Sequence, residues 1–312
     1  MERRKAAHRN PLINSALVVL VILIVIYIPL RVRMERSERT EMRPPERLTF
    51  SIFFTDGLGG RLEPPGNAPG VARGAARWAS LIEERRRERP VVVIDAGDFS
   101  PLPDAAGPAP DDWRFIEGMR LLPYDAIGIG ERETRFGLED ILTNRRSRGL
   151  PFVSSNIIDR STGRPATRTV IVKELGGERS LFGRRGVLRA GIFAVALGEY
   201  VFASRQDVSS RYDVVDSKLA ALEAVTNLRS AGCGLIVAIS HQGWPQSLEL
   251  ARDVRGIDIV LNGHPSHEHA LRQIVGRTVV FDAGMAEPAL VEVLVTVSGD
   301  SVAATLVGVP RQ

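Results

Sequence analysis

The chain has 312 residues, of which 44% are hydrophobic and 25% are charged, so it can bury a full core. The formal net charge is +4, but residues 1–33 carry six Lys or Arg against one acid, and the remainder carries 35 basic and 36 acidic side chains. The basic charge therefore belongs to the N-terminal segment, which argues against nucleic-acid binding, and the single cysteine, Cys233, excludes a disulfide within the chain.

The N-terminal segment has the pattern of a membrane anchor. Residues 12–30 contain no charged side chain and are long enough to cross a bilayer once. A cleaved signal peptide is the alternative, but it would have a shorter apolar run and small residues at a cleavage site. We expect a cytoplasmic tail at residues 1–10, an uncleaved transmembrane anchor at 11–30 and a charged stalk at 31–46. Basic residues flank both ends of the anchor, so charge alone leaves its orientation undecided.

A globular domain is expected from residue 47 to residue 312, and it begins with a strand, a helix and a second strand. Residues 48–55 are rich in Phe and Ile and lead into a glycine-rich loop, and residues 70–88 have an amphipathic helical pattern. Residues 91–98 join four apolar, β-favouring side chains to two carboxylates, Asp95 and Asp98. This stretch predicts a buried strand that ends in a polar loop.

The rest of the domain first alternates between helices and strands and then finishes in strands. The predicted helices are residues 113–122, 138–148 and 217–230, with another between the strands at 235–240 and 257–261. The other predicted strands are residues 126–129, 152–154, 169–172, 187–195, 279–282, 290–297 and 302–307. This order indicates two layers of β-sheet flanked by helices.

Polar side chains that bind metals follow three of these strands. Asp98 follows the strand at 91–95, and His241 and His264 follow the strands at 235–240 and 257–261. Ligands of open α/β sheets bind at the carboxyl ends of strands, and carboxylates and imidazoles are common ligands of divalent metals. Taken alone, this stretch favours a turn over a site, because Asp95 and Asp98 could simply shape a turn or cap the next helix. The prediction of a metal site therefore depends on the histidines.

Six short motifs follow one another along the domain. They are residues 55–62 (Thr-Asp-Gly-Leu-Gly-Gly-Arg-Leu), 95–98 (Asp-Ala-Gly-Asp), 124–130 (Tyr-Asp-Ala-Ile-Gly-Ile-Gly), 153–157 (Val-Ser-Ser-Asn-Ile), 240–241 (Ser-His) and 263–264 (Gly-His). In this order they resemble the calcineurin-like metallophosphoesterases, and among these the catalytic domain of bacterial 5′-nucleotidases. The resemblance implies an α/β fold, a four-layer α/β/β/α sandwich of two mixed sheets. It also implies two metal ions, bridged by one aspartate, that activate water against a phosphate ester.

The chain departs from this pattern at the residues that would hold the first ion. Gly57 and Gly59 stand where the family has a metal-binding Asp and His, and Ser266 stands where it has a further histidine. Arg132 replaces the histidine that stabilises the transition state, and Arg135 replaces the aspartate that orients it. The resemblance therefore implies that the first ion and the catalytic histidine are missing. Arg132 and Arg135 are candidates for binding an anion.

The ligands of the second ion are retained, with Glu131 in place of an asparagine. The candidate ligands of a single residual metal site are Asp98, Glu131, His241 and His264. An alignment shifted by one residue is the alternative, in which Asp56 and His267 act as ligands from positions next to Gly57 and Ser266.

Two functions follow from the resemblance and its departures. The first is a non-catalytic, membrane-anchored domain that acts as a structural or accessory subunit of a respiratory, photosynthetic or envelope membrane protein complex, without a cofactor or small-molecule substrate. The alternative is a periplasmic phosphoesterase that uses one divalent metal ion. In both cases the resemblance favours a bacterial inner-membrane protein with a cytoplasmic N-terminus and a periplasmic domain, attached to the bilayer through residues 12–30.

Overall fold

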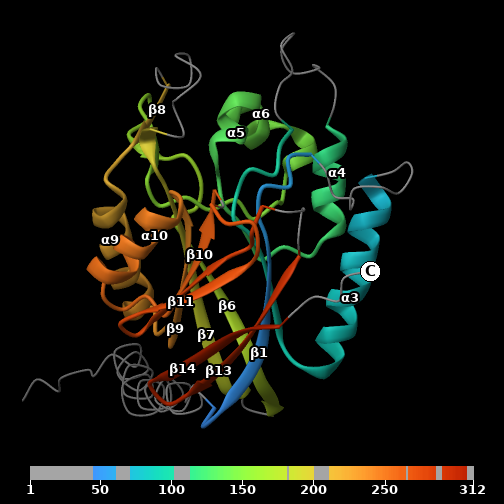
Figure 1. The fold of residues 1–312 in the computed structure, drawn as a ribbon, viewed down its shortest axis with the longest axis vertical. Helices are drawn as coiled ribbons and strands as arrows, with labels where there is room; N and C mark the ends of the chain where they lie inside the picture. Colours follow the sequence, from blue (N-terminus) through green and yellow to red (C-terminus); the bar gives the residue numbers. More distant parts are fainter. Residues whose placement is uncertain are drawn as a thin grey trace, which may run out of the picture.

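The computed structural model describes residues 45–60, 71–101, 113–180, 183–199, 211–264, 266–285 and 290–307 (Figure 1). The expected tail, the expected anchor and residues 31–44 of the expected stalk lie outside the described residues. None of the helices within these ranges combines the length and the apolar character that a membrane crossing requires.

The first sheet of the described chain joins the beginning and the end of the domain. Its strands are β1 (Leu48–Thr55), β2 (Val91–Asp95), β3 (Ala126–Ile127), β13 (Val291–Ser298) and β14 (Ser301–Val307), in the spatial order β14-β13-β1-β2-β3. β1, β2 and β3 run parallel, whereas β13 runs antiparallel to β1. The carboxyl ends of the three parallel strands therefore lie at the same edge of this sheet.

The second sheet is also mixed. Its strands are β6 (Val170–Ser180), β7 (Gly183–Ala196), β9 (Leu235–His241), β10 (Ile259–Gly263), β11 (Leu271–Val275) and β12 (Thr278–Asp282), in the spatial order β11-β12-β10-β9-β7-β6. β7, β9, β10 and β12 run parallel, and the outer strands β6 and β11 run antiparallel to their neighbours. A small third sheet contains β4 (Ile157–Asp159), β5 (Arg164–Pro165) and β8 (Tyr212–Val214).

The two large sheets pack face to face with helices on their outer faces (Figure 1). Alternate side chains of a strand point to opposite faces, so Ile52 and Phe54 of β1 pack with Val237 of the second sheet. Phe53 points the other way and packs with Trp78, in the layer of helices α3 (Val71–Glu88) and α4 (Arg114–Leu121). Helices α9 (Ser217–Ser230) and α10 (Trp244–Asp253) cover the second sheet. The order of layers is thus helix, sheet, sheet, helix.

Several short segments differ from the sequence-based expectation. The helix predicted at residues 138–148 is broken into α6 (Leu138–Thr143) and a 3-10 turn, η2 (Arg145–Ser147). A short helix that the sequence did not predict, α5 (Glu131–Phe136), precedes it. In place of the strand predicted at 152–154, Phe152 and Val153 form isolated bridges to neighbouring segments. These elements are short, so contacts with the rest of the fold decide their structure more than local periodicity does.

Candidate metal centre

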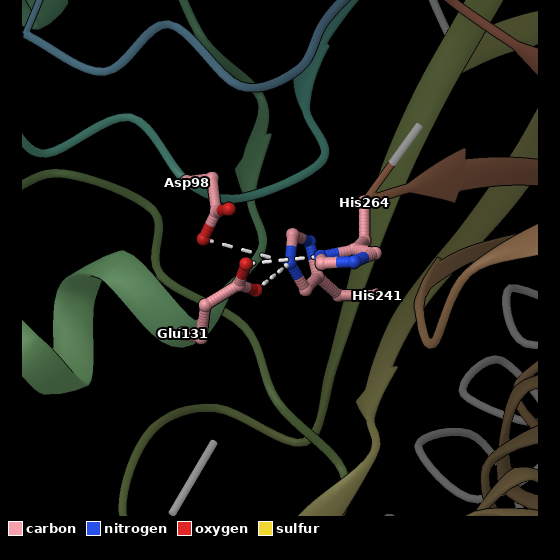
Figure 2. Close-up of side chains that lie close together, drawn as sticks. All are labelled: Asp98, Glu131, His241 and His264. Atoms are coloured by element: carbon pink, nitrogen blue, oxygen red, sulfur yellow. Dashed lines mark hydrogen bonds and ion pairs between the residues drawn. The ribbon is translucent and has the colours of Figure 1, made fainter. Parts of the chain in front are cut away.

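Four potential metal ligands from separate segments converge at the carboxyl ends of the strands. Asp98 lies in the loop after β2, Glu131 begins α5 after β3, His241 ends β9 and His264 follows β10. Each residue offers one ligand atom, and these four atoms lie within 4.8 Å of one another. Figure 2 shows the two carboxylates facing the two imidazoles. The structure thus brings together all four residues that the sequence predicted as a single metal site.

The buried ring of His241 is oriented by a backbone carbonyl. Its Nδ1 lies 2.8 Å from the carbonyl oxygen of Ala96, and because a carbonyl can only accept, Nδ1 carries the hydrogen and donates it. Nε2 therefore faces the other ligands, 2.8 Å from Oε2 of Glu131 and 3.5 Å from Oδ1 of Asp98. Metal-binding histidines commonly have such an outer hydrogen bond on the second ring nitrogen. The hydrogen bond to Ala96 thus holds the ring of His241 with Nε2 directed toward the other candidate ligands.

Glu131 connects the two histidines. While Oε2 contacts His241, Oε1 lies 2.9 Å from Nδ1 of His264. Ligand atoms bound to one ion at about 2.0–2.2 Å lie roughly 3–3.5 Å apart around a tetrahedron. The distances from His241 to Glu131 and Asp98, 2.8 and 3.5 Å, and from His264 to Glu131, 2.9 Å, are close to this spacing. Two oxygen and two nitrogen donors suit a divalent ion such as Zn²⁺ or Mn²⁺, so these residues fit one ion.

The backbone is strained at two of the four ligands. Asp98 and His264 both have φ of 59°, and they are the only non-glycine residues with positive φ in the described part of the chain. This left-handed conformation costs a non-glycine residue about 1–3 kcal/mol and is tolerated where the surroundings enforce it. Strain restricted to two ligands indicates that the fold holds these side chains in place for a function.

Glu133, which was not among the predicted site residues, holds the Asp98 loop against the start of α5. Its fully buried carboxylate accepts backbone N–H groups from Gly130 at 2.8 Å, from Asp98 at 2.9 Å and from Ser100 at 2.9 Å. These contacts fix the Asp98 loop against the first turn of α5, where Glu131 lies. The only sequence signal for Glu133 is its place directly after Glu131 and Arg132, which follow the motif at residues 124–130.

Gly130 leaves room for the ligands to meet. A Cβ at this position would lie 2.6 Å from Nε2 of His241 and even closer to Oδ1 of Asp98. Gly263 is restricted in the same way, since its Cβ would lie 2.5 Å from Nδ1 of His241 and from the carbonyl oxygen of Ala96. Close approach of the ligands therefore requires glycine at both positions, although neither has a left-handed backbone.

The charges of the ligands depend on one another. Burial raises the pKa of Asp98 to about 7, although the nearby His241 opposes this shift. Burial also disfavours ionisation of Glu131, but hydrogen bonds from His241 and His264 hold the pKa of this carboxyl well below its usual range. Burial alone would lower the pKa of His241, but the Asp98 and Glu131 carboxylates raise it well above its usual value. Without an ion, the protonated imidazole supplies the positive charge of the site.

We expect the affinity for a divalent ion to fall when the pH is lowered. His241 and Asp98 must release their protons before they can bind a metal ion, and both have a raised pKa, about 7 for Asp98. Protonated forms dominate below each pKa, so affinity should rise with pH through this range. Calorimetric titration of Mn²⁺ between about pH 6 and pH 8 measures this dependence and the protons released. A dissociation constant that does not change with pH would contradict this assignment of the charges.

The residues of the shifted alignment lie outside the group of four. His267 places Nδ1 3.2 Å from Oδ2 of Asp282, and its ring stacks edge-on against Trp244. Asp56 is buried, and its carboxyl oxygens have no hydrogen-bond partner within the described part of the chain. Burial raises the pKa of Asp56 well above its usual value, which favours the neutral acid at this position.

The two arginines predicted to bind an anion both lie on α5. The side chain of Arg132 is 25% exposed, and its Nε lies 3.6 Å from Oδ2 of Asp98. Arg135 lies in the last turn of α5 and is half-buried. Arg132 thus contacts a ligand of the candidate metal site directly, while anion binding by Arg135 stays a prediction.

The sequence relatives of the chain are phosphoesterases that act on nucleotides. No family model matches it. A 2′,3′-cyclic-nucleotide 2′-phosphodiesterase/3′-nucleotidase of Yersinia enterocolitica is 28% identical over 208 residues, which cover 61% of this chain and 32% of that protein. The 5′-nucleotidase of Rattus norvegicus is 26% identical over 235 residues, covering 69% of this chain and 37% of that protein. The chain thus spans about a third of the length of these curated relatives.

Solved structures of the same class share the fold. The NAD nucleotidase NadN of Haemophilus influenzae has a TM-score of 0.63 at 16% identity and covers 84% of this chain and 49% of its own. The calcineurin-like phosphoesterase YfkN of Bacillus subtilis has a TM-score of 0.63 at 17% identity, covering 83% and 90%. The fold is that of the phosphoesterases. More particularly, the homologues and structural neighbours are 5′-nucleotidases and calcineurin-like phosphoesterases, which confirms the resemblance seen in the motifs.

Proposed function

We propose that the domain is a metal-dependent phosphoesterase that uses one divalent ion. The observation that carries this proposal is the convergence of Asp98, Glu131, His241 and His264 within 4.8 Å. The sequence relatives, which are nucleotide phosphoesterases, support a phosphate ester as the substrate class. This is the second of the two functions expected from the sequence, and the comparisons support it better than a non-catalytic subunit.

Each residue of the site has a distinct part in this proposal. An ion held by the four ligands would supply Lewis-acid chemistry to a phosphoryl oxygen. His241 is fixed by its hydrogen bond to Ala96, so its Nε2 keeps one direction. Glu133 accepts the backbone N–H of Asp98 and so holds the Asp98 loop against the first turn of α5, where Glu131 lies. Arg132 brings a permanent positive charge next to Asp98, where a phosphate group can be oriented.

A hydrolysis assay of the full chain tests the proposed function. The protein, incubated with Mn²⁺, Zn²⁺ or Ca²⁺, is expected to release p-nitrophenol from p-nitrophenyl phosphate or its diester, and phosphate from nucleoside monophosphates. Activity should disappear on chelation with EDTA and return when the ion is added back. Binding of an ion without hydrolysis of any of these esters would contradict the proposal.

A non-catalytic role is the second candidate, and one observation favours it. Gly57 and Gly59 carry no side chains that could hold a second ion, so the site has fewer ligands than a two-ion centre requires. In this case the domain would serve as an accessory subunit of an inner-membrane complex, anchored by residues 12–30 and placed in the periplasm. Purification from detergent-solubilised membranes separates the two candidates. A chain without hydrolytic activity that co-purifies with a defined complex supports this role, and an active chain that purifies alone contradicts it.

A further inference from the structure

Arg132 contacts both oxygens of Asp98. Its backbone N–H donates to Oδ1 at 2.9 Å, and its side-chain Nε lies 3.6 Å from Oδ2. Oδ1 also lies 3.5 Å from Nε2 of His241. The side chain of Asp98 is only 6% exposed. One of its carboxylate oxygens contacts the imidazole of His241, and the other contacts the guanidinium of Arg132. A fixed positive charge lies directly beside the candidate ion position.

The guanidinium of Arg132 occupies the space that a side chain at residue 59 would need. A Cβ on Gly59 would overlap Nη1 of Arg132, whereas a Cβ on Gly57 would have no heavy atom within 4 Å. The loop itself is fixed against the Asp98 loop, because Gly57 N–H donates to the carbonyl of Gly97 at 3.1 Å and Gly59 N–H to that of Asp98 at 2.9 Å. Arg132 can therefore keep its position only if residue 59 has no side chain.

We propose that Arg132 is a substrate-binding residue that takes the place of a second cation, so that a phosphate group binds between its guanidinium and the single ion. This inference rests on the proposed function, because it uses the same site. Nε faces Asp98, which leaves the Nη groups to donate to phosphoryl oxygens, and a guanidinium binds such oxygens in a planar, two-pronged geometry. Unlike histidine, arginine keeps its charge at any physiological pH.

A matched pair of glycine variants tests the inference. Gly57 and Gly59 have nearly the same left-handed backbone, with φ of 60° and 57°, so alanine should strain both positions equally. Only Gly59→Ala collides with Arg132, and the obstacle is the end of a flexible side chain that can move away. The two variants should therefore lose similar thermal stability but differ in phosphate binding.

The measurement is the affinity for inorganic phosphate, determined by calorimetry on the full chain with saturating Mn²⁺. Gly59→Ala and Arg132→Ala are each expected to weaken phosphate binding by about 10- to 100-fold, the usual effect of losing a charged hydrogen-bonding group. Gly57→Ala should stay within about twofold of the original protein. Combining Gly59→Ala with Arg132→Ala should add little, because both act on one guanidinium.

Two results would overturn the inference. One is an Arg132→Ala variant that binds phosphate as tightly as the original protein, and the other is an equal loss of phosphate affinity in the two glycine variants. Arg132→Ala decides the question alone if the glycine variants do not fold, since its side chain is partly exposed. Phosphate binding needs no turnover, so the inference can succeed where the hydrolysis assay fails.

Discussion

Replacing His241 with alanine is expected to weaken Mn²⁺ binding by more than about 100-fold and to remove metal-dependent hydrolysis. His241 contacts both carboxylates of the site and is 1% exposed, so solvent cannot easily supply a substitute ligand. Loss of a partner that only orients a ligand already reduces metal affinity by about 10- to 100-fold, and loss of a ligand should have a larger effect. Calorimetric titration with Mn²⁺ and the p-nitrophenyl phosphate assay measure the two effects.

His267→Ala is the matched control for this experiment. His267 lies in the same region of the chain as His264, but its partner is Asp282 and it is outside the group of four. We expect its replacement to leave Mn²⁺ affinity within about threefold, an effect smaller than that of losing an outer-shell partner. Equal losses of affinity in the two variants would contradict the assignment of ligands and would favour the shifted alignment.

Replacing Glu133 with alanine is expected to lower the free energy of unfolding by at least about 3 kcal/mol. The variant leaves three backbone N–H groups, those of Asp98, Ser100 and Gly130, without their partner in a buried region. Each unpaired buried donor costs about 1–3 kcal/mol. Urea unfolding of the metal-free protein measures the change and keeps it separate from any effect of metal binding.

Glu139→Ala is the control for Glu133→Ala. Glu139 lies on the next helix, and its carboxylate pairs with Arg211 at the surface, where its side chain is 43% exposed. Exposed ion pairs contribute about 0–1 kcal/mol, so this variant should unfold close to the original protein. A Glu133→Ala variant of equal stability would show that the three N–H groups find other partners and that Glu133 does not hold the site together.

The strands of the core were predictable because the interior imposes a simple pattern on them. Residues 91–94 and 235–239 are continuous apolar runs that are buried on both faces, as expected for strands between a second sheet and a helix layer. α5 was missed because Glu131–Phe136 has one apolar side chain in six and no helical periodicity. Its structure depends on the contacts of Glu133 with a loop that is distant in sequence, which local patterns do not encode.

The ligands of the candidate site were predictable from the sequence, whereas the residues that position them were not. Asp98, His241 and His264 were identified because each follows a buried strand, and Glu131 was added by the resemblance of its motif. Glu133 and Gly130 were missed because they act through backbone contacts and close packing, not through a recognisable ligand chemistry. Sequence reasoning finds groups that bind a ligand more readily than groups that shape the space around it.

Gly59 and Arg132, two of the residues that suggested a degenerate site, are in contact in the structure. The resemblance implies that Gly59 and Arg132 replace family residues in separate motifs, and the side chain of Arg132 lies where a side chain at residue 59 would be. The two changes are therefore compatible with each other, while either one alone would create a collision or an empty space. This pairing supports our proposal of a site with one ion and an arginine.

The number of ions bound per chain distinguishes a single-metal site from an empty site and from a two-ion centre. Purified protein equilibrated with Mn²⁺ and freed of excess metal should contain one ion per chain by elemental analysis. The ion should be lost in the Glu131→Ala variant, because Glu131 contacts both His241 and His264. No bound ion, or two ions per chain, would show that Asp98, Glu131, His241 and His264 do not form a single-metal site.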